Sequence, residues 1–221
     1  MAVRDALLAL LTTGPAYGFQ LHGGLAERTG ARRSVNVGQT YATLERLAKQ
    51  RLVEPAGTTA DGLPLHRLTS AGEAAATAWL SGADASGADP WDETVDRVLI
   101  ALSLPRVDAA AITASEAAKW RERRSAAMAS VAASDGPTAP TAPTAAAPDA
   151  SADDGTASDD EPVRGARRGL VSLASQAEAA RAEAMLDWLA TAGTLDAHAL
   201  AFGSSTTRPK RGRRPAAAPA A

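Results

Sequence analysis

The chain has 221 residues, enough for one domain or two small ones, and its 23 basic and 25 acidic side chains nearly balance. It has no cysteine, which excludes disulfide frameworks, thiolate metal sites and thiol redox switches. Its three histidines lie far apart, so we expect no metal site, and no apolar run approaches the length of a membrane span. Asp5 interrupts the first apolar stretch, which does not resemble a signal peptide, so we expect a soluble cytoplasmic protein.

Composition divides the chain into five segments. Alanine accounts for 55 residues, whereas Leu, Ile, Val and Phe together number 36, so only part of the chain can bury a core. Two stretches are too polar to contribute to it and are expected to be disordered, one with seven acids and no base and one with five bases and no acid. The predicted segments are an N-terminal module at 1–83, a helical region at 84–133, the acidic linker at 134–163, a last helix at 164–203 and the basic tail at 204–221.

Apolar spacing predicts the first two helices. Over residues 3–11, apolar side chains recur three and four positions apart, which is the pattern of an amphipathic helix, and Gly14-Pro15 stops it. A second helix is expected over residues 17–29, with Leu21 and Leu25 facing inward. Its three glycines each weaken a helix by about 1 kcal/mol, so tertiary packing must hold it.

The third predicted helix follows Asn36 and has two unlike faces. Asn36 can cap this helix, and Gln39 can return the bond as in a capping box. The apolar face carries Val37, Thr40, Leu44, Leu47 and Ala48. The opposite face carries Gln39, Ala42, Arg46 and Lys49, with Thr43 and Gln50 beside them and Tyr41 on the border. Such a polar face can reach base edges and phosphates in a major groove; the alternative is an ordinary surface helix.

A two-stranded hairpin and a fourth helix follow. Leu52-Val53-Glu54 is typical of a strand, Asp61-Gly62 of a turn, and residues 65–69 of a returning strand. Ser70-Ala71-Gly72-Glu73 predicts a capping box that opens an alanine-rich helix carrying Trp79. Three helices, a hairpin and a further helix form the winged variant of helix-turn-helix, so the expected fold class is mainly α with a β-hairpin wing.

Five motifs, in this order, resemble the PadR family of bacterial transcriptional regulators. They are Ala6-Leu7-Leu8-Ala9-Leu10-Leu11, Gly14-Pro15-Ala16-Tyr17-Gly18-Phe19-Gln20-Leu21, Asn36-Val37-Gly38-Gln39-Thr40-Tyr41-Ala42-Thr43-Leu44-Glu45-Arg46-Leu47, Leu52-Val53-Glu54 and Arg67-Leu68-Thr69-Ser70-Ala71-Gly72. The resemblance implies a winged-helix DNA-binding domain over residues 1–83, with double-stranded DNA as its partner. The implied DNA contacts are Gln39, Thr40, Tyr41, Thr43, Arg46, Lys49 and Arg67, with Tyr41 on a phosphate.

The chain departs from the family pattern at three places. Ala42 stands where the family often has arginine after the tyrosine of the third helix. His66 stands where the family often has an aromatic residue before the arginine of the last strand. The wing, residues 57–62, has no lysine or arginine, so phosphate contacts from this part must come from Arg67.

Three further helices are expected, with an apolar stripe over residues 91–102 and alanine-rich helices over 108–133 and 167–192. Alanine-lined helices bury little surface within one chain, so we expect them to pack across the two-fold axis of a homodimer. The region also resembles the helical dimerisation part of longer PadR-type proteins. That resemblance lies in Asp89-Pro90-Trp91, Leu99 to Leu104, Arg181-Ala182-Glu183 and Leu186-Asp187-Trp188-Leu189.

Two features outside the winged helix are candidates for further contacts. The resemblance implies a small aromatic effector, for which Trp91 and Trp188 are the candidates; the alternative is that both indoles are core anchors. The tail resembles an AT-hook, a short minor-groove binder. Its candidate contacts are Arg208, Lys210, Arg211, Arg213 and Arg214. The alternative is a solvated tail that binds DNA through charge alone.

The sequence shows no nucleophile–base pair, phosphate-binding glycine loop or paired-carboxylate motif, so we expect neither an enzyme nor a cofactor. The expected function is that of a homodimeric transcriptional regulator, a repressor that binds a palindromic operator and is released by a small-molecule effector. One alternative is a winged-helix module that binds another protein. A second is a nucleoid-type DNA binder driven by the basic tail.

Overall fold

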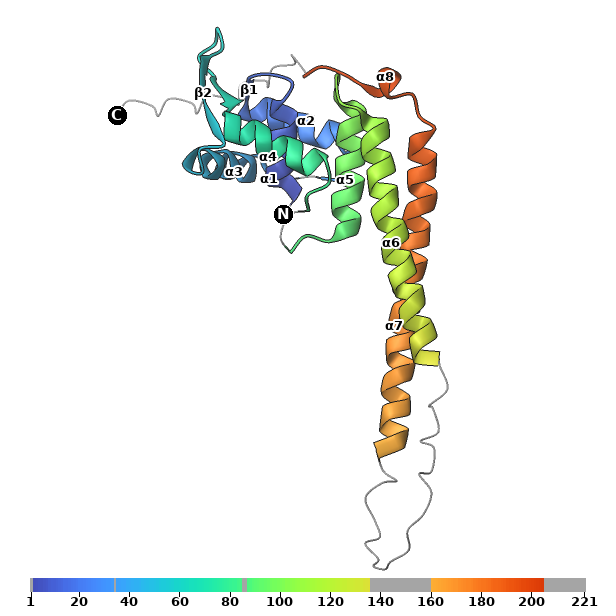
Figure 1. The fold of residues 1–221 in the computed structure, drawn as a ribbon. Coiled ribbons are helices and arrows are strands. Elements are labelled where there is room, and N and C mark those ends of the chain that lie inside the picture. The colour runs from blue at the N-terminus through green and yellow to red at the C-terminus, as the bar shows by residue number, and fades with distance from the viewer. Residues whose placement is uncertain (1, 34, 85–86, 136–159, 205–221) are drawn as a thin grey trace, which may run out of the picture. The chain divides into compact units, whose positions relative to one another are not determined.

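The computed structural model describes residues 2–33, 35–84, 87–135 and 160–204 (Figure 1). These residues fall into two compact units, one formed by residues 1–115 with 192–221 and the other by residues 116–191. None of the helices in the described parts of the chain combines the length and the apolar character that a membrane crossing requires.

The first unit contains a winged helix. Its helices are α1 (Ala2–Leu11), α2 (Gly18–Arg28), α3 (Val37–Lys49) and α4 (Ser70–Leu80), and its strands are β1 (Ala16–Tyr17), β2 (Val53–Thr58) and β3 (Pro64–Leu68). The three strands form an antiparallel sheet in the order β1-β3-β2, and β2 and β3 make the wing. The predicted mainly helical winged-helix fold is confirmed (Figure 1).

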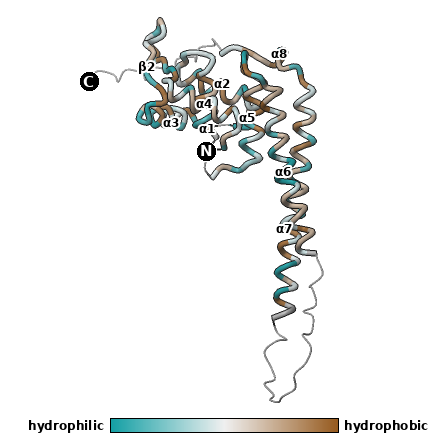
Figure 2. The backbone as a smooth tube through the Cα atoms, viewed as in Figure 1, coloured by the Kyte–Doolittle hydropathy of each residue, from teal (hydrophilic) through white to brown (hydrophobic). Residues whose placement is uncertain are grey.

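The core of this unit is built around α1, in which every side chain from Ala6 to Leu11 is buried. The other helices direct their apolar positions toward it, as the periodicity predicts. The largest of these side chains are Leu21, Leu25, Leu44, Leu47, Trp79 and Ile100. α3 therefore has its apolar side fixed against the core and its other side in solvent. Figure 2 shows the hydrophilic residues of α3.

Helix α5 (Pro90–Ser103) joins the winged helix through buried polar contacts. Asp89 caps it by accepting hydrogen bonds from the backbone N–H groups of its first turn. The indole Nε1 of Trp79 on α4 donates to Glu93 Oε2 over 2.6 Å, and Arg97 Nε donates to the carbonyl oxygen of Trp79 over 2.6 Å. α5 is thus held to the winged helix by directional bonds as well as apolar packing.

The structure corrects two predicted helix starts. The second helix was expected from Tyr17, but Ala16 and Tyr17 pair with β3 opposite His66 and Leu65, so α2 begins one residue later. The fourth helix was expected to be capped by Ser70. Thr69 caps it instead, because its Oγ1 accepts the backbone N–H of Gly72.

The second unit consists of most of α6 (Ala109–Asp135) and α7 (Asp160–Gly193). Trp120, Met185 and Leu189 are buried in it, and Ser175 Oγ donates to Ser130 Oγ over 2.9 Å. The linker predicted at 134–163 is too long at both ends, because residues 134–135 and 160–163 are helical. A proline in the first turn, as in Asp160-Glu161-Pro162, is compatible with a helix start. The rest of that predicted linker lies outside the described residues, as does the tail from residue 205.

Candidate nucleic-acid interface

The outer face of α3 is set by a cap and by two buried leucines. Asn36 Oδ1 accepts the backbone N–H of Gln39 over 2.7 Å, which is the predicted N-cap and fixes where the helix begins. Leu44 and Leu47 are almost completely buried, which fixes the rotation of the helix about its axis. Of the predicted contact residues on α3, those left exposed are Gln39, Tyr41, Arg46 and Lys49; the acidic Glu45 is exposed as well.

Two of the predicted contact residues are not at this surface. Thr40 is 0% exposed and lies on the same side as the buried leucines, with its Oγ1 3.5 Å from His22 Nδ1. Thr43 is 6% exposed, because its Oγ1 donates to the carbonyl oxygen of Gln39 and lies 3.2 Å from Arg46 Nη2. Thr40 thus lies on the apolar face, as its spacing predicts, while Thr43 is buried rather than beside the polar face. Because both side chains are buried, we leave the two threonines out of the candidate interface.

Arg46 lies along its own helix. Its Nε donates to the carbonyl oxygen of Ala42 over 3.1 Å, and its Nη2 donates to Thr43 Oγ1. Two bonds to its own helix hold the guanidinium in one place while leaving the residue exposed. Lys49 is exposed in the last turn, where a positive charge is favourable beside the helix C-terminus.

Tyr41 is held in position by a glycine that the sequence motif contains but whose role was not predicted. A Cβ atom added to Gly18, the first residue of α2, would lie 2.6 Å from Tyr41 Cε1. The tyrosine ring therefore packs directly on the α2 backbone, and a larger residue at Gly18 would force the ring to move. Tyr41 as a whole remains 41% exposed.

The wing contributes little positive charge. Arg67 on β3 lies opposite Glu54 on β2, and both its Nε and its Nη2 are 2.8 Å from Glu54 Oε1. Between the two strands, residues 59–63 carry no basic side chain. Burial lowers the pKa of His66, so this residue is neutral at physiological pH. Arg67 is the one basic residue of β2 and β3, and it is half of a surface ion pair.

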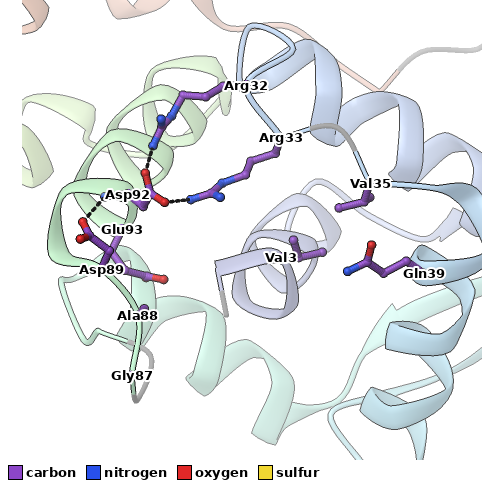
Figure 3. A pocket seen from close by; sticks show the side chains of 10 residues that line it. All are labelled: Val3, Arg32, Arg33, Val35, Gln39, Gly87, Ala88, Asp89, Asp92 and Glu93. Atoms are coloured by element: carbon purple, nitrogen blue, oxygen red, sulfur yellow. Dashed lines mark hydrogen bonds and ion pairs between the residues drawn. The ribbon is translucent and has the colours of Figure 1, made fainter.

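The connection between α2 and α3 is joined to α5 by four charged residues that sequence reasoning missed. In the connection from α2 to α3, Arg33 Nε is 2.5 Å from Asp96 Oδ2, and Arg32 Nη2 is 2.5 Å from Asp92 Oδ1. Figure 3 shows Arg32 and Arg33 both directed toward Asp92. Burial raises the pKa of Asp96 although Arg33 opposes the shift. The hydrogen bond from Arg32 holds the pKa of Asp92 below its usual range. The only sequence signal was a pair of arginines before α3 and a pair of acids four residues apart on α5.

These ion pairs border a cavity of about 430 Å³. Figure 3 shows Glu93 of α5 directed into it from one side and the amide of Gln39 from the other. Its remaining lining includes Val3 and Val35. Gln39 therefore belongs to the exposed face of α3 and also lines the cavity beside α5.

The effector and tail predictions remain predictions. Trp91 on α5 and Trp188 on α7 are each only partly buried, whereas Trp79 and Trp120 are core anchors. The basic residues from Arg208 to Arg214 lie outside the described residues. Among the residues that are described, no group of three or more His, Cys, Asp or Glu side chains could hold a metal ion.

Comparison with known proteins gives one family and a set of structures. Residues 7–78 match the Transcriptional regulator PadR-like family. Among solved structures, PadR of Bacillus subtilis in complex with operator DNA is 18% identical over 86% of this chain and 97% of that chain, with a TM-score of 0.35. The same protein in complex with p-coumaric acid is 16% identical over 86% of this chain and 99% of that chain, with a TM-score of 0.32. No curated protein sequence matches the chain.

Proposed function

Over residues 7–78 the chain belongs to the PadR-like family of transcriptional regulators, and from this premise we propose that it is a homodimeric repressor that reads an operator with α3. The observation that carries the proposal is the outer face of α3. Its polar side chains are exposed on a helix whose apolar side, N-terminus and own Tyr41 ring are all held by contacts.

The dimensions and chemistry of α3 suit a major groove. A helix of 13 residues is about 20 Å long and fits the groove lengthwise. Arginine pairs with guanine and glutamine with adenine through two parallel hydrogen bonds, so we assign base reading to Arg46 and Gln39. Lys49, Tyr41 and Arg67 are assigned to phosphates, where contacts fix the register without specifying sequence. Arg67 must exchange its bond to Glu54 for a phosphate.

Replacing both Gln39 and Arg46 with alanine tests the reading face. Each lost base contact is expected to weaken binding to the preferred sequence by about 1–3 kcal/mol, and discrimination between operator and random DNA should fall with it. The operator is first selected from random-sequence DNA with the parent protein, and affinity is then measured by fluorescence anisotropy. Folding is unaffected because both residues are exposed on the side away from Leu44 and Leu47.

Arg106→Ala is the matched control, since it removes an equally exposed arginine from the connection between α5 and α6. If the double variant binds the selected operator as tightly as this control, α3 is not the reading helix. A parent protein that binds no DNA at low salt would indicate the protein-interaction module instead. Binding without sequence preference that is lost with the tail would indicate the nucleoid-type binder.

We extend the proposal to a homodimer held by the second unit. Five large apolar side chains on α6 and α7 are exposed in the single chain: Met128, Val163, Leu170, Val171 and Leu173. Such exposure in a monomer is unfavourable and marks a surface that associates. Two-fold symmetry would then place half-sites about 34–36 Å apart or at a multiple of this spacing.

Replacing Leu170 and Leu173, which are 67% and 63% exposed, with glutamate is expected to dissociate the dimer. The introduced charges would have to be desolvated in the dimer but remain hydrated in the monomer. Sedimentation velocity measures the change in mass, and circular dichroism checks that the helices persist. A double variant that sediments like the parent would place the dimer interface elsewhere.

Repression follows from occupancy, because a dimer bound over a promoter excludes polymerase without a further contact. We include release by a small aromatic effector in the proposal. Trp91 and Trp188 are its candidate contacts, because aromatic rings can stack on a planar ligand and both residues are only partly buried.

A further inference from the structure

Helix α3 exposes an acid beside its basic residues. Successive residues of an α-helix are turned by about 100°, so the line of α3 that lies opposite its two buried leucines passes close to Ala42 and Lys49. Glu45 lies on one flank of this line and Arg46 lies on the other, at about equal angles, and both residues are exposed. A groove that admits Arg46 therefore brings Glu45 equally near to its floor.

The carboxylate of Glu45 is not neutralised by the cations beside it. Arg46 directs its guanidinium to the carbonyl oxygen of Ala42 and to Thr43 Oγ1. Lys49 follows Glu45 at the spacing of four residues that favours an ion pair on a helix. Within the described parts of the chain, however, neither Lys49 nor any other residue forms an ion pair or hydrogen bond with the Glu45 side chain.

A free carboxylate is unfavourable on a surface that only follows the DNA backbone. DNA presents one negative charge per about 1.7 Å of helix axis, and these phosphates repel an acid. The same carboxylate is favourable where it accepts a hydrogen bond from a base, because hydrogen bonds to charged acceptors are about twice as strong as neutral ones. The position of Glu45 near the outermost line of α3 therefore favours a contact with a base edge.

The chemistry of the major groove decides which base this is. Two bases present an amino group there, cytosine through N4 and adenine through N6. Adenine places its N7 acceptor beside that amino group, and N7 repels a carboxylate. The neighbouring edge of cytosine carries only a C–H group. A carboxylate acceptor therefore favours cytosine, just as a guanidinium favours guanine.

We propose that Glu45 specifies a cytosine in each half-site by accepting a hydrogen bond from the N4 amino group of that base. The inference rests on the proposed function, in which α3 reads an operator. It adds an acidic specificity residue on the flank of α3 opposite Arg46, where the family resemblance implied only polar and basic contacts.

Base preference is measured for the parent, Glu45→Ala and Glu45→Gln. Each base pair of the selected operator is replaced by the other three, symmetrically in both half-sites, and affinity is measured by fluorescence anisotropy. For the parent, replacing the cytosine read by Glu45 should weaken binding about 5- to 150-fold. Glu45→Ala should lose this preference and keep the others. Glu45→Gln should shift it toward adenine, because glutamine pairs with both N6 and N7 of that base.

A base analogue tests the hydrogen bond itself. The base 2-pyrimidinone has the ring of cytosine without its amino group. At the proposed cytosine it should weaken binding by the parent about fivefold more than binding by Glu45→Ala, which has no acceptor to lose. Both proteins meet the same altered duplex, so the comparison cancels the effect of the analogue on the DNA.

Glu73→Gln is the matched control, because Glu73 is an exposed acid on α4 and not on the reading face. It makes the same change of charge as Glu45→Gln and should leave every base preference unchanged. Urea unfolding checks folding. Both Glu45 variants should unfold close to the midpoint of the parent, since the side chain is exposed and holds no partner.

One result would overturn the inference directly. If Glu45→Ala binds all operator variants more tightly by a common factor, the carboxylate only repels phosphates. Equal effects of the analogue on the parent and on Glu45→Ala would overturn it as well. A parent that selects no operator would instead show failure of the proposed function, and the inference would fall with it.

Discussion

Replacing Gly72 with alanine is expected to destabilise the winged helix by about 3 kcal/mol or more. A Cβ atom at this position would lie 1.9 Å from the carbonyl oxygen of Leu52, which is backbone and cannot rotate away. The same oxygen accepts a hydrogen bond from the backbone N–H of Thr69, the N-cap residue of α4. Displacing the oxygen therefore breaks the bond that holds the start of α4 beside β2. Urea unfolding monitored by the circular dichroism of the helices measures the loss.

Gly23→Ala is the matched control for this substitution. Gly23 lies inside α2, and an added Cβ there meets no atom within 4 Å. Alanine should therefore stabilise α2 by about 0.5–1 kcal/mol through its helix propensity. If the Gly72 and Gly23 variants have the same unfolding midpoint, the close approach of α4 to β2 is not present in solution.

Replacing Arg33 with alanine is expected to cost about 3–5 kcal/mol at neutral pH, because it leaves a buried carboxylate without its main partner. Asp96 is 0% exposed, and Arg33 Nε is its 2.5 Å partner, whereas Arg32 Nε is 3.5 Å away. The cost should fall as the pH is lowered toward the ordinary carboxyl range. Burial already raises the pKa of Asp96 in the folded state, and loss of Arg33 raises that pKa further.

The direction of this pH dependence follows from proton uptake. A carboxyl whose folded pKa exceeds its unfolded pKa binds more protons when folded, so stability rises as the pH falls through the folded pKa. Asp92 acts in the opposite sense, because Arg32 lowers its pKa and its contribution is lost as the pH falls through the folded pKa. Urea titrations at neutral and mildly acidic pH should show parent and Arg33→Ala converging.

Arg67→Ala provides the control, since the Arg67–Glu54 pair is exposed on the wing and should contribute less than about 1 kcal/mol. Its effect should not change over the same pH range. If the difference in unfolding free energy between the parent and Arg33→Ala is the same at every pH, Asp96 is not the group left unpaired.

Local signals in the sequence predicted the parts of the fold that depend on neighbouring residues. Apolar periodicity located α1, and Asn36 was correctly predicted to cap α3 because a cap needs only the residues that follow it. The cap of α4 lies one residue before the predicted position. Thr69 and Ser70 both carry a hydroxyl that can cap a helix, and only the contact of Thr69 with the residues that lead into β2 distinguishes them.

The candidate site was predicted in part, for a reason visible at Thr40. A helical wheel places this residue with the leucines, yet the family motif suggested a DNA contact, and the packing of α2 on α3 buries it. Contacts between segments far apart in the sequence could not be predicted, because they leave no pattern among neighbouring residues. Arg33 and Asp96 are 63 residues apart, and Arg28 and Phe202 are 174 residues apart. Such pairs depend on tertiary arrangement, which spacing within one element does not encode.

The ion pairs from Arg32 and Arg33 to α5 have an energetic consequence for regulation. They join the connection that leads into α3 to α5, so a shift of α5 away from this connection must break them. If α3 reads DNA as proposed and depends on these bonds for its placement, a ligand that favours a displaced α5 is expected to weaken that binding. By reciprocity, the proposed operator would weaken the binding of that ligand by the same factor. The free energy needed to break the Arg33–Asp96 pair sets how much more tightly such a ligand must bind the displaced arrangement than the original one.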